Sequence, residues 1–353
     1  MKWEENVRKA APYVPGEQPR KKGVIKLNTN ECPYPPSPMV AEALQKIENQ
    51  DLRLYPEFPE QTPLTAELAA YHHVGDKQIF VGVGSDDVLS LAFLTFFQSG
   101  KPVFFPDITY SFYDVWADIY RIPYKVRQLD EHFCIRKEDY MGENGGVIFP
   151  NPNAPTGVLL DVDTIEEIVA ANQDVVVIVD EAYIDFGGAS SLCLLPKYDN
   201  LLIVRTFSKS RAMAGVRIGY AIGNEKLIQY LNDVKYSINS YTMNRPALVL
   251  GAAAVRDDAY FQEICQKIVA TRERTERRLG ELGFTFPHSY GNFIFASHES
   301  VSAREIFGKL KDYDIYVRYW NKNRIDNYLR ITIGTDEQMD ILFATLSKIL
   351  KEK

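Results

Sequence analysis

A short stretch of the chain, VRTFSKSRAMAGVR at residues 204–217, collects positive charge without one acidic side chain. The chain as a whole has a formal net charge of -7, so this local excess stands out. The side chains of interest are those of Arg205, Thr206, Ser208, Lys209, Arg211 and Arg217. Arginine and hydroxyl groups bind phosphate, and a lysine amine forms Schiff bases with carbonyl compounds. We therefore expect an anion site and a reactive amine here, with Arg205 and Arg211 left as surface charges.

An acidic residue after another apolar stretch supplies a complementary group. Residues 175–179 read VVVIV, which is typical of a strand buried on both faces of a parallel sheet, and Asp180 follows directly. The turn Gly84-Ser85-Asp86 follows another expected strand, and its small residues let backbone N–H groups approach an anion. Pyridoxal phosphate needs a lysine for its Schiff base, a carboxylate for its pyridine nitrogen and donors for its phosphate. Lys209, Asp180 and their neighbours provide all three, so we expect this cofactor.

Other cofactor and metal motifs are missing from the sequence. The stretch GVGSDD at residues 82–87 places an acid where a nicotinamide-binding G-x-G-x-x-G motif needs glycine or alanine. There is no phosphate-loop, G-x-S-x-G or H-E-x-x-H pattern. His72 and His73 are adjacent but have no third ligand nearby, so we expect no metal site.

Composition narrows the expected partners and location. The net charge of -7 and a pI near 5.4 disfavour nucleic-acid binding, which needs a basic face. No apolar run approaches the roughly 20 residues that a membrane-spanning helix requires. The cysteines are widely separated and the first residues, MKWEENVRKA, contain no apolar signal region. We expect a cytoplasmic protein with small-molecule substrates.

The elements that must position these residues alternate between strands and helices. Expected strands at 78–83, 103–105, 146–149, 175–179 and 201–204 alternate with apolar helical stretches, which predicts an α/β fold with a mostly parallel sheet. In such sheets ligands bind outside the carboxyl ends of the strands, where the polar residues above stand.

Three segments are expected along the chain. We assign residues 28–245 to the large cofactor-binding domain and residues 246–353 to a smaller α+β domain with strands near 293–296, 315–319 and 329–333. Residues 1–27 are proline-containing and predict an arm that contributes to the small domain and to a lid over the site.

Eight motifs in a fixed order carry a resemblance to a known family. They are PYVPGEQP (12–19), KLNTNECPYPPSP (26–38), RLYPE (53–57), GVGSDD (82–87), NPNAPTG (151–157), DEAYIDF (180–186), TFSKSRAMAGVRIGY (206–220) and LRITIGT (329–335). The chain resembles the fold type I aminotransferases dependent on pyridoxal phosphate, and within them the histidinol-phosphate aminotransferases, along nearly its whole length. Each motif alone is modest, whereas their order and spacing together are specific.

The resemblance implies a role for each matching residue. Lys209 would form the Schiff base and carry protons, Asp180 would pair with the pyridine nitrogen, and Tyr183 would contact the phenolic oxygen of the cofactor. Tyr110 would stack on the cofactor ring. The phosphate would be surrounded by Ser85, Asp86, Thr206, Ser208 and Arg217, with the first two acting largely through their main chain.

Two further positions follow from the resemblance. Tyr55 matches a tyrosine that family members send to the neighbouring subunit's cofactor phosphate, which implies a homodimer with a shared active site. Family members usually place an asparagine just before Pro-Thr-Gly, whereas this chain has Ala154 there. Either Asn153 reaches the phenolic oxygen from one position away, or Tyr183 contacts that oxygen alone; we place Asn153 among the cofactor-binding residues.

Substrate choice is expected to depend on two arginines of the small domain. Arg330 and Arg318 match the pair that meets the substrate phosphate in the family, with Tyr13 of the arm as part of a lid. Two arginines can surround a phosphate from two sides. The same pair would bind the carboxylate of 2-oxoglutarate or glutamate.

The resulting hypothesis is transamination of L-histidinol phosphate with 2-oxoglutarate, giving imidazole acetol phosphate and L-glutamate. Family analogy supplies these substrate names, because composition cannot. Two reactions on the same site stay open: transamination of aromatic amino acids, and decarboxylation of a phosphorylated amino acid such as threonine phosphate. A non-catalytic cofactor-binding regulator is a third alternative, and the presence of both Lys209 and Asp180 speaks against it.

Overall fold

A seven-stranded sheet forms the larger part of the computed structural model, which describes residues 2–351. Its strand order is β2-β8-β7-β6-β5-β3-β4. The strands are β2 (Ile79–Gly82), β3 (Val103–Pro106), β4 (Tyr124–Arg127), β5 (Val147–Pro150), β6 (Val177–Asp180), β7 (Leu201–Thr206) and β8 (Gly219–Gly223). The pairs from β4 to β7 are parallel, and β8 pairs antiparallel with both β7 and β2. The predicted α/β class with a mostly parallel sheet is confirmed.

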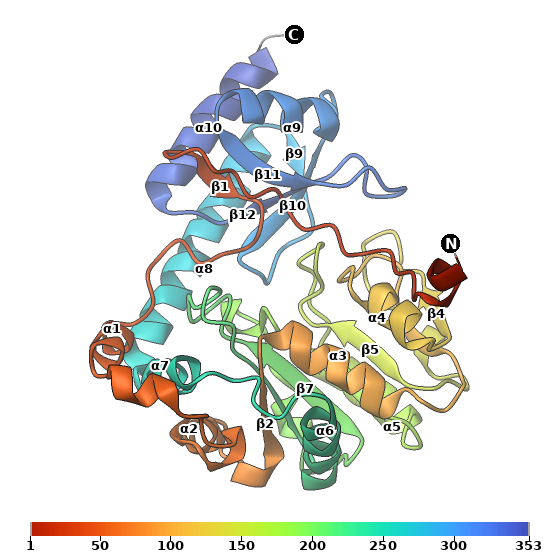
Figure 1. Ribbon diagram of the computed structural model, residues 1–353. Helices are drawn as coiled ribbons and strands as arrows, with labels where there is room; N and C mark the ends of the chain where they lie inside the picture. The colour runs from red at the N-terminus through yellow and green to blue at the C-terminus, as the bar shows by residue number, and fades with distance from the viewer. Residues whose placement is uncertain (1, 352–353) are drawn as a thin grey trace.

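Helices cover both faces of this sheet (Figure 1). Alternate residues of the strands pack on α3 (Ser85–Phe96), α4 (Tyr113–Tyr120) and α6 (Glu225–Ile238). The residues between them face α5 (Val162–Ala171) on the opposite side. Every residue of β5, β6 and β7 is buried, which explains why these strands are apolar at nearly every position. The sheet is therefore a rigid support for the loops at its carboxyl edge.

The helices near one edge come from distant parts of the chain. They are α1 (Pro38–Gln45), α2 (Pro63–His72) and α7 (Arg245–Arg256), and they pack together beside β2 and β8. α7 ends at Arg256, and α8 (Asp258–Glu281) begins directly after Asp257, whose side chain accepts a hydrogen bond from the Tyr260 amide.

A five-stranded sheet of order β1-β11-β12-β10-β9 forms the smaller part within residues 2–351. Its strands are β1 (Ile25–Leu27), β9 (Phe284–Thr285), β10 (Phe293–His298), β11 (Ile315–Tyr319) and β12 (Leu329–Thr332). The helices α8, α9 (Ala303–Asp312) and α10 (Asp336–Lys351) cover it. β1 pairs in parallel with β11, so the end of the predicted arm is part of this sheet. The predicted bounds at residues 27 and 245 stay predictions.

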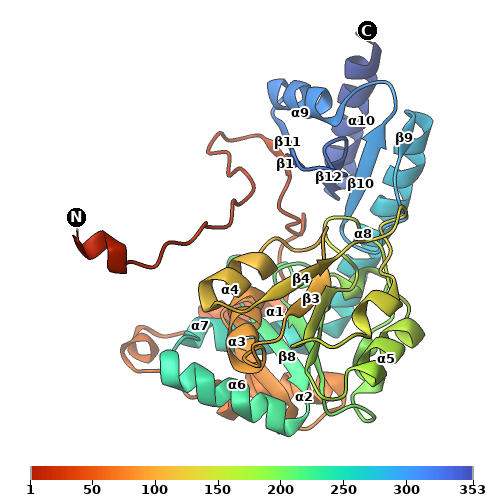
Figure 2. The same ribbon diagram turned by 90° about the vertical axis from the view of Figure 1, so that its right-hand side faces the viewer.

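The residues before β1 run along the outside of the molecule. Figure 2 shows this segment leaving the smaller sheet near β1, extending away from the body and ending in η1 (Lys2–Asn6). Among the described residues no helix is long and apolar enough to cross a membrane.

Candidate active site

Two adjoining cavities open at the carboxyl edge of the seven-stranded sheet. The inner one has a volume of about 340 Å³ and the outer one about 190 Å³. Both are lined by Thr29, Tyr110, Ala154, Tyr183 and Lys209. They therefore form one continuous site between the large sheet and the smaller one.

A buried carboxyl group lies at the floor of the inner cavity. Asp180 ends β6 and is only 4% exposed. Its Oδ2 accepts a hydrogen bond from Tyr113 Oη at 3.0 Å, and its Oδ1 accepts one from the Ala182 amide at 3.2 Å. Burial raises the pKa of this carboxyl to about 7, against the two hydrogen bonds that lower it. No cationic side chain pairs with Asp180 among the described residues, so the cavity is suited to a cationic group of a ligand.

Lys209 reaches the boundary between the cavities from the turn after β7. Its Nζ donates to the Thr29 carbonyl at 3.2 Å and lies 5.8 Å from the centre of the Tyr183 ring. Inside the turn, the Ser208 amide donates to Thr206 Oγ1 at 3.1 Å. The amine is thus held at the junction where a molecule in one cavity would meet a molecule in the other.

The far end of the inner cavity is built to receive an anion. Arg217 Nη1 lies 3.4 Å from Ser208 Oγ, and its Nη2 lies 3.4 Å from Asp86 Oδ2. Ser85 begins α3, so the free N–H groups of that helix face this end. A Cβ at Gly84 would lie 2.3 Å from Arg217 Nη2, and one at Gly219 would lie 2.2 Å from the Ser85 nitrogen. The two glycines are needed for the close approach of these segments.

An aromatic residue separates this end from the outer cavity. Tyr110 lines both cavities, and its Oη donates to Asp86 Oδ1 at 2.7 Å. Its ring contacts Tyr113 edge-on, with centroids 5.9 Å apart. The ring is therefore fixed as a wall of the inner cavity.

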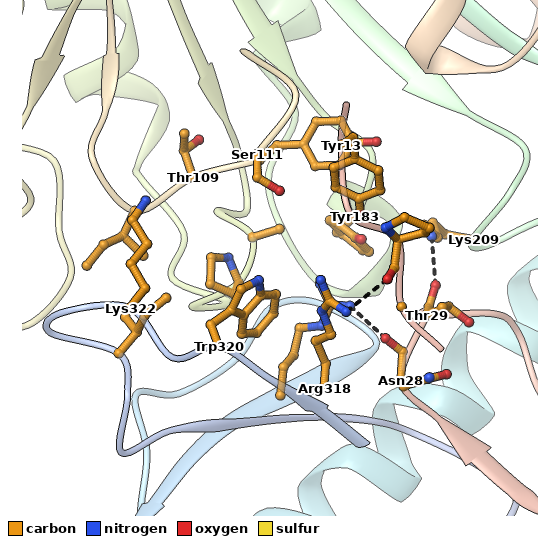
Figure 3. A pocket seen from close by; sticks show the side chains of 18 residues that line it. Tyr13, Asn28, Thr29, Thr109, Ser111, Tyr183, Lys209, Arg318, Trp320 and Lys322 are labelled. Carbon is orange, nitrogen blue, oxygen red and sulfur yellow. Dashed lines mark hydrogen bonds between the residues drawn. The ribbon is translucent and has the colours of Figure 1, made fainter. Parts of the chain in front are cut away.

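Two arginines line the outer cavity from neighbouring strands. Arg318 of β11 and Arg330 of β12 are direct partners in the antiparallel pairing. The guanidinium carbons of Arg318 and Arg330 lie 5.1 Å and 5.2 Å from the Trp320 ring centre. Arg330 donates to the Asn28 carbonyl at 2.9 Å, and burial lowers its pKa from the usual value. Figure 3 shows Arg318 and Trp320 facing Tyr183 and Lys209 across this cavity.

The N-terminal segment closes one side of the outer cavity. Arg318 donates to the carbonyls of Val14 and Pro15 at 3.0 Å and 3.2 Å. Tyr13 lines the cavity, and its ring stacks on Phe112 with centroids 4.2 Å apart. The residues predicted as a lid therefore lie at the outer cavity, where they contact Arg318 of the smaller sheet and Phe112 at the start of α4.

Two predicted site residues are not brought to the cavities of this chain. Asn153 uses its amide nitrogen on the Ile108 carbonyl at 3.0 Å and Thr156 Oγ1 at 2.9 Å, and Ala154 lines the inner cavity in its place. Tyr55 is 77% exposed and stacks on Tyr241 with centroids 4.5 Å apart. All other predicted site residues line one of the two cavities.

The expectation that Arg205 and Arg211 are surface charges is wrong. They are 7% and 8% exposed. Arg205 lies in β7 and donates to Glu181 Oε2 at 2.9 Å, next to Asp180 on the neighbouring strand. Arg211 lies over the Phe261 ring at 4.1 Å and donates to the Ala254 carbonyl. Both therefore brace the loops that carry Asp180 and Lys209.

The sequence did not single out Asn30, Tyr113 or Trp320 as members of the site. Tyr113 begins α4 three residues after Tyr110, and its Oη reaches Asp180. Trp320 directly follows β11, two residues after Arg318, and lines the outer cavity. Asn30 is joined to the site by hydrogen bonds with Tyr183 and Thr332, which lie 153 and 302 positions away in the chain, so no local pattern indicates it.

Comparisons with known proteins agree with this geometry. The family model described as aminotransferase class I and II matches residues 22–346. The histidinol-phosphate aminotransferase of Clostridium beijerinckii is 50% identical over 348 residues, which cover 99% of this chain and 97% of that protein. Histidinol-phosphate aminotransferase 1 of Hydrogenovibrio crunogenus is 51% identical over 349 residues, covering 99% and 98%.

A solved structure shows the same fold at low identity. The histidinol-phosphate aminotransferase of Sinorhizobium meliloti, in complex with pyridoxal-5'-phosphate, is 23% identical and superposes with a TM-score of 0.88 over 97% of this chain and 96% of that one. The family match and the full-length relatives leave one assignment: the chain belongs to the aminotransferase class I and II family.

Proposed function

We propose that this protein is a histidinol-phosphate aminotransferase of histidine biosynthesis that uses pyridoxal 5'-phosphate. It would transfer the amino group of L-histidinol phosphate to 2-oxoglutarate, which yields imidazole acetol phosphate and L-glutamate. The observation that carries the proposal is the placement of Lys209 between a cavity that ends in Asp180 and Arg217 and a cavity that ends in Arg318 and Arg330. The names of the full-length relatives supply the substrate.

The inner cavity fits the proposed cofactor on its own evidence. A buried carboxyl without a cationic partner is suited to a protonated pyridine nitrogen, since a cation there removes the cost of charging Asp180. The opposite end offers Arg217, Ser208, Thr206 and the first amides of α3 to a phosphate. When bound, the cofactor supplies an electron-accepting ring that stabilises negative charge at the substrate Cα.

Each side chain of the inner cavity has a defined task in this proposal. Tyr110 packs against the cofactor ring, and Tyr183 contacts its phenolic oxygen. Ser85 and Asp86 contribute main-chain N–H groups, while the Asp86 carboxylate holds Arg217 and Tyr110 in place. Asp180 keeps the ring nitrogen protonated. Lys209 would hold the cofactor through its amine and, from the boundary of the two cavities, would accept the proton of the substrate Cα and return it to the cofactor side.

The outer cavity would hold the substrate by its anionic end. Arg318 and Arg330 present two guanidinium groups from adjacent strands, and charge-assisted bonds of this kind suit both a phosphate and a carboxylate. Tyr13 closes the same cavity and limits the access of water. One anion site would thus serve both half-reactions, with the phosphate of the donor replaced by the far carboxylate of 2-oxoglutarate.

We also propose a homodimer with a shared active site. Tyr55 stacks on Tyr241, and large apolar side chains are exposed in the chain segments before each of these residues, namely those of Leu44, Leu52, Leu54 and Ile238. A second copy would cover this apolar surface, and Tyr55 would reach the neighbour's cofactor phosphate. The expected cytoplasmic location rests on cysteine usage, and all four cysteines are free.

The visible absorption spectrum tests the proposal. Purified protein with pyridoxal phosphate should show a yellow band that L-histidinol phosphate, added without a keto acid, converts to the amine form of the cofactor. A band that responds only to phenylalanine or tyrosine would favour an aromatic aminotransferase. Release of carbon dioxide from threonine phosphate without use of 2-oxoglutarate would favour the decarboxylase. A protein that forms no band would contradict the assignment of Lys209.

A further inference from the structure

Asn30 lies buried behind the wall of the inner cavity that Tyr183 forms. It is 1% exposed and has a left-handed backbone with φ of 55°. Its Nδ2 lies 2.9 Å from Tyr183 Oη, and the two residues are 153 positions apart in the chain. Asparagine is one of the few residues that adopt a left-handed backbone readily, so this residue type fits the backbone conformation at position 30.

Thr332 of β12 determines which way the Asn30 amide is turned. Thr332 Oγ1 accepts a hydrogen bond from the Asn30 main-chain N–H at 3.0 Å, and it donates its own proton to Asn30 Oδ1 at 2.9 Å. The reverse orientation of the amide would leave the buried Thr332 proton without an acceptor among the described contacts. Asn30 Oδ1 therefore faces Thr332, and Nδ2 faces Tyr183.

This orientation makes Tyr183 an acceptor on its buried side. A tyrosine hydroxyl has one proton, and Asn30 Nδ2 can only donate to it. The Tyr183 proton is consequently free to point away from Asn30, toward the cavity that the residue lines. The chain of bonds runs in one direction, from the Asn30 backbone through Thr332 and the Asn30 amide to Tyr183.

The direction matters because the neighbouring loop offers no donor of its own. In the 151–157 loop, Ala154 lines the inner cavity, and its methyl group cannot donate a hydrogen bond. The amide nitrogen of Asn153 donates instead to the Ile108 carbonyl and to Thr156 Oγ1. Tyr183 must then donate to the phenolic oxygen of the cofactor without a second side-chain donor from this loop.

We propose that Asn30 is a positioning residue that fixes Tyr183 as a hydrogen-bond donor to the phenolic oxygen of the cofactor. This inference rests on the proposed function, because it needs the cofactor in the inner cavity. Two cations face Tyr183, namely Lys209, whose Nζ is 5.8 Å from the ring centre, and Arg330. Neither is changed in the variants below, so their charges are constant in the comparison.

The test uses the pH at which the visible band of the bound cofactor changes. A donor on the phenolic oxygen stabilises its negative charge most when the nitrogen that joins Lys209 to the cofactor has lost its proton. Loss of the donor should therefore keep that nitrogen protonated to higher pH. Asn30→Asp retains the shape and the backbone preference but presents an acceptor to Tyr183, so the tyrosine proton turns away from the cavity. We expect the midpoint to rise by about one pH unit or more.

The charge introduced by Asn30→Asp needs its own control. A buried carboxylate near the site raises the midpoint by charge alone, whether or not residue 183 has a hydroxyl. The same substitution is therefore made in a Tyr183→Phe background, where only the charge effect can remain. Asn292→Ala, which removes a 3.0 Å bond from Asn292 Nδ2 to the Asn30 carbonyl, controls for general damage. It should lower the melting temperature and leave the midpoint unchanged.

The outcomes separate the two proposals. A shift from Asn30→Asp that is at least about threefold larger with Tyr183 than with Phe at position 183 supports the positioning role. Equal shifts in both backgrounds, or an equal shift from Asn292→Ala, would overturn it. If the unchanged protein binds no cofactor and shows no band, the proposed function fails instead.

Discussion

Tyr113 Oη, at the start of α4, donates a hydrogen bond of 3.0 Å to Oδ2 of Asp180, at the end of β6. Tyr113 is completely buried, so the bond is shielded from water. Tyr113 therefore fixes Oδ2 of the carboxyl group, and the Ala182 amide fixes Oδ1. The fold leaves Asp180 a single open direction, which is into the inner cavity.

Removal of the Tyr113 hydroxyl should weaken the binding of the cofactor more than the binding of the substrate. Hydrogen bonds to charged groups contribute about 1.5–3 kcal/mol, so Tyr113→Phe should raise the dissociation constant of pyridoxal phosphate roughly tenfold or more. The KM for histidinol phosphate should change little, because Tyr113 does not line the outer cavity. Cofactor titration followed at the visible band measures the first effect. Phe112→Leu is unsuitable as a control because Phe112 stacks on Tyr13, whereas Tyr124→Phe on exposed β4 should change neither constant.

Asp180 should make the cofactor-free protein less stable as the pH rises. Burial raises the pKa of this carboxyl to about 7 in the folded chain, from 3.8 as the reference, so the folded state binds the extra proton between these values. Stability from this group is therefore present below pH 3.8 and lost as pH rises to 7, at up to about 1.4 kcal/mol per pH unit.

Asp180→Asn removes this titration. The unfolding free energy of the cofactor-free variant, relative to the unchanged protein, should increase from pH 5 to pH 7, and denaturant unfolding at several pH values measures it. With bound cofactor the unchanged protein should be the more stable of the two, because the variant lacks the anion that pairs with the ring nitrogen. A difference that does not depend on pH would mean that Asp180 is charged throughout.

Arg205 and Glu181 form a buried ion pair that should contribute to stability as a unit. Their side chains are 9% and 0% exposed, and Ser190 Oγ completes the network with bonds to both. Removal of one partner leaves an unpaired buried charge, so Arg205→Met should destabilise the fold by about 3–5 kcal/mol. Thermal unfolding measures the loss. Arg256→Met breaks the exposed pair with Glu67 and should cost less than about 1 kcal/mol, as surface pairs do.

The sequence predicted the sheet and most of the site because the relevant signals are local. A strand that is buried on both faces must be apolar at nearly every position, as β6 is, and the first polar residue after it is then exposed to the carboxyl edge. Asp180 could be assigned in this way, and Lys209 and Arg217 through the basic stretch that follows the next expected strand. Their mutual placement needed the resemblance, because no periodicity specifies the order of strands.

The errors arose where a contact comes from a distant segment. The expected strand ended at residue 204 and left Arg205 as a surface charge, whereas β7 continues to Thr206 and the partner of Arg205, Glu181, lies 24 residues earlier. The cofactor contact of Asn153 stays a prediction: Asn153 stands one position before the usual asparagine, and its amide nitrogen donates to the Ile108 carbonyl and to Thr156 Oγ1. Asn30 was not predicted because its partners Tyr183 and Thr332 lie 153 and 302 positions away in the chain.

Arg318 should hold residues 14 and 15 of the N-terminal segment as well as the substrate, whereas Arg330 should hold the substrate without holding those residues. Arg318 donates to the Val14 and Pro15 carbonyls, and Arg330 donates to Asn28 just beyond β1. Arg318→Ala and Arg330→Ala remove the same charge from the same cavity. Each should lower kcat/KM for histidinol phosphate by about tenfold to a hundredfold, given the strength of charge-assisted bonds.

Limited proteolysis distinguishes the two variants. Trypsin sites at Arg20, Lys21 and Lys22 follow the tethered carbonyls. Cleavage there should be several times faster in Arg318→Ala than in Arg330→Ala, because loss of the tether lets the segment open locally. Saturating phosphate or histidinol phosphate should slow the cleavage of the unchanged protein if the segment closes over the bound anion. Equal cleavage of both variants would show that Tyr13 stacked on Phe112 holds the segment without Arg318.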